Sequence, residues 1–264
     1  MSSHQYSESE SKHETRDRRL FNRIATNYLM KDILPSSRIA RKCRLEQTMK
    51  VATINGDISL LEVGCGAGFS VDYLGGKFYE YCGLDYSEDL IKYARAFHSG
   101  ERITFYNINL KNFKTERRFD VILLIGVLHH LTDSYTMLRY MVNLLKPGGW
   151  IVANEPQAGN PLIRLARSIR KRIDPQYSHE QQEFKIVQLC NIFECAGLIE
   201  IRFVPQGILS TPFAEVKMPF QKFTQAIATL ACLFDKVIEK NFSSKISKLT
   251  WNVAAAGQKP SFPL

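Results

Sequence analysis

Three glycines at alternate positions follow a short apolar segment that contains a carboxylate. The segment at positions 60–70 reads L-L-E-V-G-C-G-A-G-F-S, so that Glu62 precedes Gly64, Gly66 and Gly68. Glycine permits a tight turn, a positive φ and the close approach of a ligand to the backbone. The apolar run is too short for a helix, so we expect a buried strand, a glycine turn and the start of a helix. Such a unit is typical of a nucleotide site.

The spacing of the glycines differs from that of a dinucleotide site. The dinucleotide pattern G-x-G-x-x-G would require a third glycine at position 69, where the chain has Phe69. The carboxylate of Glu62 would repel a pyrophosphate, whereas it suits an ammonium or sulfonium charge. We therefore expect a cationic nucleoside without phosphates as the ligand.

A second carboxylate lies where a ribose contact would need it. The segment Tyr81–Asp85 predicts a second strand, and Asp85 follows Gly64 by 21 residues, close to the usual offset of about 20. A carboxylate can accept hydrogen bonds from both ribose hydroxyls. The alternative is that Asp85 only caps a turn. After it, Ser87 predicts a helix N-cap.

These segments resemble the class I S-adenosylmethionine (SAM) dependent methyltransferases, whose first motif is E/D-x-G-x-G-x-G. The segments F-D-V-I-L, L-H-H-L and L-L-K-P-G-G-W occur in the order specific to that family, and the matching region runs from about Leu60 to Pro156. The pattern F-x-x-I-A-x-x-Y from Phe21 to Tyr28 resembles the lead-in helix of the quinone-biosynthesis enzymes, within the methyltransferase type 11 group. That pattern often continues with Asp, where this chain has Leu29.

The resemblance implies SAM as the cofactor, with Asp85 on its ribose. It places an aromatic residue, here Tyr28, near the SAM methyl group, although ordinary core packing is an equal alternative for this side chain. The family's acid on the adenine amino group is replaced by Asn109, whose side-chain carbonyl can still accept a hydrogen bond. The predicted cofactor-binding residues are Glu62, Gly64, Cys65, Gly66, Gly68, Asp85, Tyr86, Asn109, Leu110, Ile125, Gly126 and Tyr28.

Methyl transfer from a sulfonium is an in-line displacement in which the enzyme mainly positions the reactants. A base is needed only if the acceptor must lose a proton. His129, His130 and Glu155 are the titratable candidates near the ends of the fourth and fifth predicted strands. The histidine pair belongs to the family's common core, so a structural or pocket-lining role is the alternative. The six cysteines form no C-x-x-C pair, and we expect no metal site.

Strands alternate with helices around these residues, which predicts an α/β fold with a doubly wound parallel sheet. The resemblance implies a seven-stranded Rossmann-like methyltransferase sheet of order 3-2-1-4-5-7-6, with strand 7 antiparallel. We expect helices at 69–74, 87–97, 133–145 and 178–196, and we expect Lys146–Gly149 and Gly197 to end the last two.

The chain divides into five predicted regions. These are a disordered tail (1–14), a helical N-terminal lid (15–52), a SAM-binding core (53–204) with a basic helical insert at about 157–177, a helical cap (205–248), and the last strand with a tail (249–264).

Two predicted inserts could bind partners of the protein. Pro161–Ile173 alternates apolar residues at helical spacing with five arginines and lysines, and could lie on an anionic membrane; a surface helix and an RNA contact are the alternatives. The cap carries an apolar stripe that could line a cavity for a bulky substrate, form a dimer seam or pack in the core. The stripe consists of Phe223, Ala226, Ile227, Leu230, Phe234, Val237 and Ile238.

The favoured function is methyl transfer from SAM to an apolar or amphiphilic small molecule, such as a lipid, a quinone precursor or a specialised metabolite. The net charge of +9 raises the alternative of RNA or another nucleic acid as acceptor. However, amino-group DNA enzymes carry D/N-P-P-Y where this chain has Gly126-Val127-Leu128-His129. A non-catalytic SAM-fold subunit would not need the glycine loop and Asp85. The polar N-terminus and the cysteine pattern predict a cytoplasmic protein, at most peripheral to a membrane.

Overall fold

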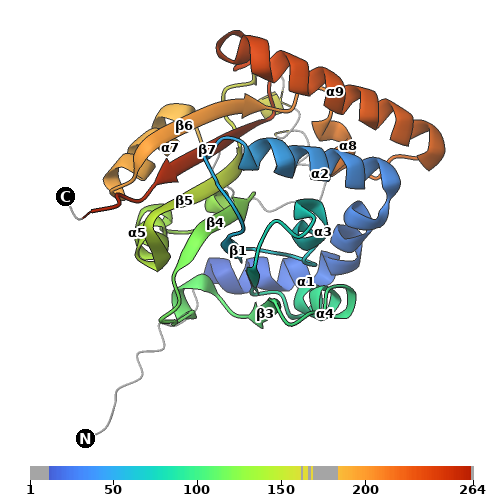
Figure 1. Cartoon of the computed structure of the whole chain (residues 1–264). Helices are drawn as coiled ribbons and strands as arrows, with labels where there is room; N and C mark the ends of the chain where they lie inside the picture. The colour runs from blue at the N-terminus through green and yellow to red at the C-terminus, as the bar shows by residue number, and fades with distance from the viewer. Residues whose placement is uncertain (1–11, 162, 166–167, 169–183, 263–264) are drawn as a thin grey trace, which may run out of the picture.

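A seven-stranded sheet forms the centre of the protein (Figure 1). The computed structural model describes residues 12–161, 163–165, 168 and 184–262. The strand order is β3-β2-β1-β4-β5-β7-β6; β1 to β5 pair in parallel, and β7 pairs antiparallel with both β5 and β6. The order and directions that the resemblance implied are therefore confirmed. The strands are β1 (Ser59–Val63), β2 (Glu80–Asp85), β3 (Ile103–Asn107), β4 (Phe119–Ile125), β5 (Leu145–Pro156), β6 (Ile199–Gln206) and β7 (Asn252–Gln258).

Helices cover both faces of the sheet. Alternate residues of each strand point to opposite faces, so each strand contributes to two hydrophobic cores. Leu60 and Tyr81 pack with the helices α1 to α4, whereas Leu61 and Cys82 pack with α5 and α7 on the other face. The helices that flank the sheet are α1 (Lys12–Ile33), α2 (Pro35–Met49), α3 (Ser70–Leu74), α4 (Glu88–Phe97), α5 (Ser134–Leu144) and α7 (Ile186–Cys195), with short 3₁₀ turns η1 (Leu110–Asn112) and η2 (Leu128–His130).

Several local predictions agree with the helix ends. The side chain of Ser87 accepts a hydrogen bond from the N–H of Leu90 and caps α4. Gly75 takes a left-handed conformation at the end of α3, and Gly197 has a φ of +85° after α7. Glycine tolerates these angles without the steric strain that a Cβ would cause.

Three boundaries differ from the predictions. Leu145 is extended and pairs with Phe119, so Lys146–Gly149 belongs to β5 and does not end a helix. Full burial of Leu145 in the sheet explains why strand pairing prevails there over a glycine cap. Helix α7 begins at Ile186, not at Ser178; residues 178–183 lie outside the described residues. Helix α1 begins at Lys12, inside the predicted tail.

The lid comes from both ends of the chain. Helices α1 and α2 precede β1, while α8 (Thr211–Glu215) and α9 (Gln221–Ile246) lie between β6 and β7. Helix α2 packs against both α8 and α9, and Figure 1 shows α2 and α9 running side by side at the top of the molecule. The predicted helical N-terminal lid and helical insert before the last strand are therefore present.

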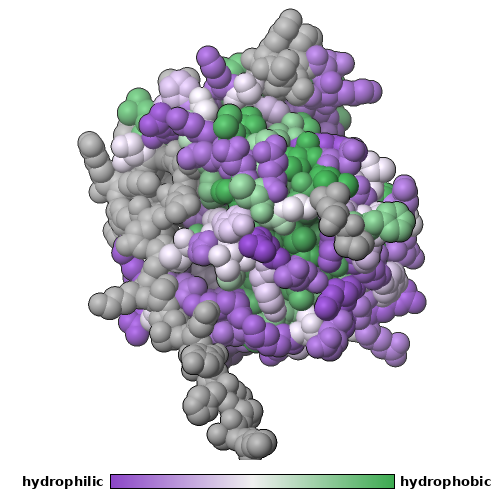
Figure 2. All heavy atoms as spheres, turned by 90° about the vertical axis from the view of Figure 1, so that its left-hand side faces the viewer, coloured by the Kyte–Doolittle hydropathy of each residue, from purple (hydrophilic) through white to green (hydrophobic). Residues whose placement is uncertain are grey.

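The surface of the described residues is mostly hydrophilic on one side of the molecule. Figure 2 shows that hydrophilic side chains cover most of the described surface on the left-hand side of Figure 1, with hydrophobic side chains gathered near the middle of that face. In the part of the chain that is described, no helix has the length and apolar character needed to cross a membrane. The predicted basic helix at Pro161–Ile173 lies largely outside the described residues and stays a prediction.

Candidate cofactor and acceptor site

A cavity of about 690 Å³ opens at the carboxyl ends of β1, β2, β4 and β5. This is where ligands bind in parallel α/β sheets. The strand ends form one wall, and α1, α2 and α8 form the opposite wall. Pockets for drug-sized ligands measure about 300–1,000 Å³, so this cavity has room for a nucleoside together with a small acceptor.

The three glycines of the loop have different structural reasons. All three have positive φ values, +70° at Gly64, +55° at Gly66 and +79° at Gly68. A Cβ on Gly64 would lie 2.5 Å from Cγ2 of Val127, and one on Gly68 would lie 2.8 Å from Cζ of Phe105, so these two glycines permit close packing. A Cβ on Gly66 would meet no atom within 4 Å. Gly66 therefore leaves its backbone open to the cavity that it lines.

Asp85 joins the glycine loop to the end of β2. Its Oδ2 accepts a hydrogen bond from the N–H of Gly66 (2.9 Å), and its Oδ1 accepts one from the N–H of Ser87 (2.8 Å). Each carboxylate oxygen has a further lone pair, and the residue lines the cavity. Burial raises the pKa of Asp85 to about 6, and the two backbone hydrogen bonds offset part of that rise. Two acceptor oxygens beside an open backbone fit a ribose diol.

Glu62 supplies a second buried carboxylate in the same wall. It accepts hydrogen bonds from the hydroxyl of Ser70 (2.7 Å) and from the hydroxyl of Tyr81. Burial raises the pKa of Glu62 to about 7, against the hydrogen bonds from Tyr81 and Ser70, and the nearby carboxylates of Asp32 and Asp85 contribute to the rise. Two carboxylates held out of water would be stabilised by a cationic ligand. These two carboxylates suit the sulfonium and ammonium groups of SAM better than a pyrophosphate.

Glu155 organises the turn after β4 and does not line the cavity. It is fully buried. Its Oε1 accepts from the N–H groups of Val127 and Leu128 (both 2.9 Å). Its Oε2 accepts from the N–H of His129 (3.3 Å) and contacts Nδ1 of the same residue (2.7 Å). Four partners fill the lone pairs of the carboxylate. The prediction of Glu155 as a base is therefore corrected: it positions His129.

The two histidines lie side by side on the cavity, with ring centroids 4.2 Å apart. The carboxylate of Glu155 favours a proton on Nδ1 of His129, which leaves Nε2 as the acceptor. Nδ1 of His130 lies 2.9 Å from Oδ2 of Asp17 on α1. Burial, together with the neighbouring His129, lowers the pKa of His130, so its ring stays neutral at physiological pH.

Most predicted site residues meet at this cavity. Asn109 does not line it; its side-chain oxygen accepts from the N–H of Lys111 and caps η1. Leu110 is buried and Gly68 packs inside the loop, so neither reaches the cavity wall. The predicted residues that line the cavity are Tyr28, Glu62, Gly64, Cys65, Gly66, Asp85, Tyr86, Ile125, Gly126, His129 and His130.

A charged cluster on the lid was not predicted. Glu215 on α8 accepts from Nη1 of Arg44 (2.8 Å) and lies 3.4 Å from Nζ of Lys31. Burial would raise the pKa of Glu215, but these cations outweigh it and hold that pKa well below its usual range. Nε of Arg41 lies 3.0 Å from Asp32. These residues lie on separate helices in charge-rich segments, and no motif distinguishes them in the sequence.

No three His, Cys, Asp or Glu side chains of the described residues are grouped as a metal site would need. All six cysteines are free.

Comparison with known proteins relates the first four strands of the sheet, with the start of β5, to a known family. Residues 61–151 match the methyltransferase-domain family. A ubiquinone biosynthesis O-methyltransferase of Nitrosomonas europaea is 27% identical over 60% of this chain and 70% of its own length. The protein of the same name from Thiobacillus denitrificans is 26% identical over 53% of this chain and 63% of its own length. The chain thus spans about two thirds of these curated relatives.

Solved structures share the fold. A SAM-dependent methyltransferase from Thermotoga maritima has a TM-score of 0.64 at 16% identity, over 91% of this chain and 98% of its own. The N-methyltransferase NodS from Bradyrhizobium japonicum, in complex with S-adenosyl-L-homocysteine, has a TM-score of 0.53 at 20% identity, over 82% of this chain and 86% of its own. At such identities the likeness concerns the fold alone.

Proposed function

The chain belongs to the class I SAM-dependent methyltransferase family, and we propose that it methylates an apolar or amphiphilic small molecule such as a lipid, a quinone precursor or a specialised metabolite. The observation that carries the proposal is the shared cavity. One wall holds Gly66 and Asp85, and the other wall is built from the lid. A donor and an acceptor of small size can therefore meet inside one cavity between the strand ends and the lid.

The cofactor end of the cavity follows from the carboxylates and the open loop. Asp85 would hold the ribose hydroxyls, the backbone of Gly66 would lie against the ligand, and Glu62 would compensate its positive charge. When bound, SAM supplies an electrophilic methyl group. Tyr28 lines the same cavity and packs edge-on against Phe21, which supports its assignment near the methyl group.

The lid wall of the cavity is apolar in one part and charged in another, where Lys31, Arg44 and Glu215 line it. Leu20, Phe21 and Ile24 on α1 line the cavity near the histidines, with His130 edge-on to Phe21 at 5.4 Å between ring centroids. An apolar wall favours an acceptor with an aromatic or aliphatic body. The relatives named as O-methyltransferases of ubiquinone biosynthesis support such an acceptor, at low identity.

His129 is the residue that we assign to proton removal from a hydroxyl acceptor. Its Nδ1 is engaged by the buried carboxylate of Glu155, and Nε2 remains to accept a proton at the cavity. Asp17 holds the neighbouring ring of His130 in place through its contact with Nδ1. An acceptor that is already a neutral amine would need no such base.

Binding of SAM tests the cofactor part of the proposal. SAM should raise the melting temperature, while NADH should not, because the loop lacks the dinucleotide spacing. Asp85→Asn should abolish the shift, whereas Asp89→Asn, an exposed neighbour on α4, should retain it. A shift of equal size in the Asp85 variant would remove this residue from the site.

Labelled methyl groups test the acceptor class. Incubation of the protein with cell extract and labelled SAM should send the label into the organic phase. Label recovered in RNA would contradict the proposal and favour a nucleic-acid methyltransferase. No label transfer, together with a normal SAM shift, would favour a non-catalytic SAM-binding subunit.

Peripheral contact of Pro161–Ile173 with an anionic membrane belongs to the same proposal. Its support is the composition of that segment, with its five basic residues, since most of it lies outside the described residues.

A further inference from the structure

Helix α9 presents its large apolar side chains to solvent and its small ones to the protein. Ala228, Ala231 and Cys232 are buried, and Cys232 packs with Ala40 and Cys43 on α2. Phe223 and Leu230 on the opposite side are 68% and 66% exposed. None of the predicted stripe lines the cavity of about 690 Å³. The exposed apolar residues of this region, here called the α9 face, are Val216, Phe220, Phe223, Ile227, Leu230, Leu233, Phe234 and Val237.

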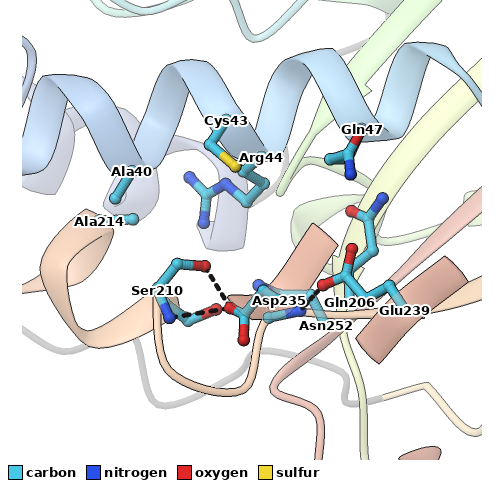
Figure 3. Close-up of a pocket in the computed structure, with 12 residues that line it drawn as sticks. Ala40, Cys43, Arg44, Gln47, Gln206, Ser210, Ala214, Asp235, Glu239 and Asn252 are labelled. Atoms are coloured by element: carbon cyan, nitrogen blue, oxygen red, sulfur yellow. Dashed lines mark hydrogen bonds between the residues drawn. The ribbon is translucent and has the colours of Figure 1, made fainter. Parts of the chain in front are cut away.

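Buried acids fix the helix in this orientation (Figure 3). Asp235 accepts hydrogen bonds from the N–H of Ser210 (2.9 Å) and from its hydroxyl (2.6 Å), and from the N–H groups of Ile208 and Leu209 (both 3.1 Å). Glu239, one turn later, accepts from the N–H of Gly207 (2.7 Å). Rotating α9 to bury its apolar side would break these five hydrogen bonds and move both carboxylates into solvent. The hydrogen bonds therefore keep the apolar side of α9 facing outward.

The exposed charges of α9 are positive. Between Gln221 and Asn241, where its side chains are described, both acids face inward and Lys222 and Lys240 are exposed. Lys236 is partly exposed, and its Nζ lies 3.6 Å from Oε2 of Glu46 on α2. Lys236 and Lys240 follow Lys222 by about four and five helical turns, so the three lie along one border of the apolar side. An apolar strip with a lysine border is the pattern of a helix that lies in a membrane interface.

A second copy of the chain fits this surface poorly. An antiparallel two-fold pair of α9 helices would bring the lysine border against its own copy. Glu46 on α2 offsets Lys236, but no exposed acid on the described part of α9 would compensate the repulsion between the Lys222 and Lys240 side chains. An anionic lipid surface supplies the opposite charge and an apolar interior at once.

We propose that the α9 face docks on an anionic lipid bilayer. The face continues to the mouth of the cavity, because Val216 is both exposed and part of the cavity wall. An apolar acceptor dissolved in the bilayer can thus enter beside the docked helix. This entry route rests on the proposed function; the docking itself does not.

Vesicles of phosphatidylglycerol and phosphatidylcholine test the docking. The full chain should co-sediment with vesicles rich in phosphatidylglycerol and far less with pure phosphatidylcholine. Leu230→Asp should weaken the partition by about tenfold, the loss expected when one leucine-sized side chain no longer leaves water. Val187→Asp on α7, a residue that is 69% exposed outside the α9 face, is the matched control and should bind normally. Raising the ionic strength from about 0.1 M to about 1 M should also weaken binding.

Two further measurements separate the possible failures. The SAM-induced melting shift of Leu230→Asp should equal that of the parent, so loss of docking with a normal shift leaves the cofactor site intact. Equal vesicle binding by the parent and Leu230→Asp would overturn the docking proposal. A concentration-dependent dimer in solution that Leu230→Asp dissolves would overturn it as well, in favour of a second copy of the chain.

Discussion

At the scale of single residues, Asp85 and Glu62 share one feature: both carboxylates are buried before any ligand binds, with pKa values raised to about 6 and about 7. In the folded protein they bind protons at a pH where the unfolded chain has released them. This pair therefore contributes stability at low pH that is lost as pH rises through about 6 to 7. A cationic ligand reverses that loss, because it favours the ionised forms.

We therefore predict that SAM binds more weakly at acid pH. From pH 8 to pH 6 its affinity should fall by about tenfold or more, since binding must displace protons from both carboxylates. Calorimetric titration in two buffers of different ionisation enthalpy would count the protons released. The substitution Glu62→Gln should make the affinity for SAM less dependent on pH. An affinity that stays constant over this range would show that neither carboxylate senses the ligand.

His129 gives a second prediction at this scale. His129→Gln should lower kcat by about 10²–10⁴-fold for a hydroxyl acceptor, because general-base catalysis contributes that much, while the SAM-induced melting shift persists. Glu155→Gln should also lower kcat and displace the pH profile, since the amide no longer fixes the proton on Nδ1. An unchanged kcat in His129→Gln would exclude this residue as the base.

At the scale of elements, the anchoring of α9 by Asp235 can be measured directly. Asp235→Asn keeps the shape but replaces one acceptor oxygen by an NH₂ group that faces backbone donors. We expect a loss of about 1–3 kcal/mol in the free energy of unfolding, the range for an unsatisfied buried polar group. Denaturant unfolding would measure it. Asp89→Asn at an exposed site should change stability by less than about 0.5 kcal/mol. Equal stabilities of the two variants would show that the acid does not hold the loop.

The elements that the sequence predicted correctly are those set by local chemistry. The glycine loop, the strand that ends at Asp85 and the cap at Ser87 depend on neighbouring residues, and all three are present. The helix before Leu145 ends within one residue of its prediction, but the start of β5 at Leu145 was missed because pairing with Phe119, a distant residue, decides it.

Other site features depended on contacts between segments far apart in the chain. Asp17 meets His130 across 113 residues, and Asp235 meets Ser210 through the tertiary packing of α9. The helical periodicity of the sequence identified the apolar stripe of α9 but not whether the stripe faces the protein or the solvent. An amphipathic pattern does not show that buried acids on the other side of the helix will turn that side toward the protein.

At the scale of the whole molecule, both ends of the chain build one lid. Ala40 and Cys43 on α2 pack with Ala214 on α8 and Cys232 on α9 in a small separate core. Arg44 on α2 adds the ion pair to Glu215. The methyltransferase family matches residues 61–151 and leaves out all of these lid helices. The strands β1 to β4 and the loops after them are thus the shared part, and the lid is the part in which this chain can differ.

The last prediction follows from the way the insert joins the sheet. Gln206 at the end of β6 pairs directly with Asn252 at the start of β7. Residues 207–251 therefore leave and re-enter the sheet at adjacent positions, and a two-residue Asn-Gly turn could close the hairpin in their place. We expect this variant to keep the sheet and to lose the support of α2. Hydrogen exchange should show β1 and β4 still protected and α2 exchanging at least about tenfold faster, because local stability follows buried contacts. If α2 kept its parental protection from exchange, the sheet and its other helices would be enough to stabilise the N-terminal lid. Residues 207–251 would then contribute nothing to the stability of α2.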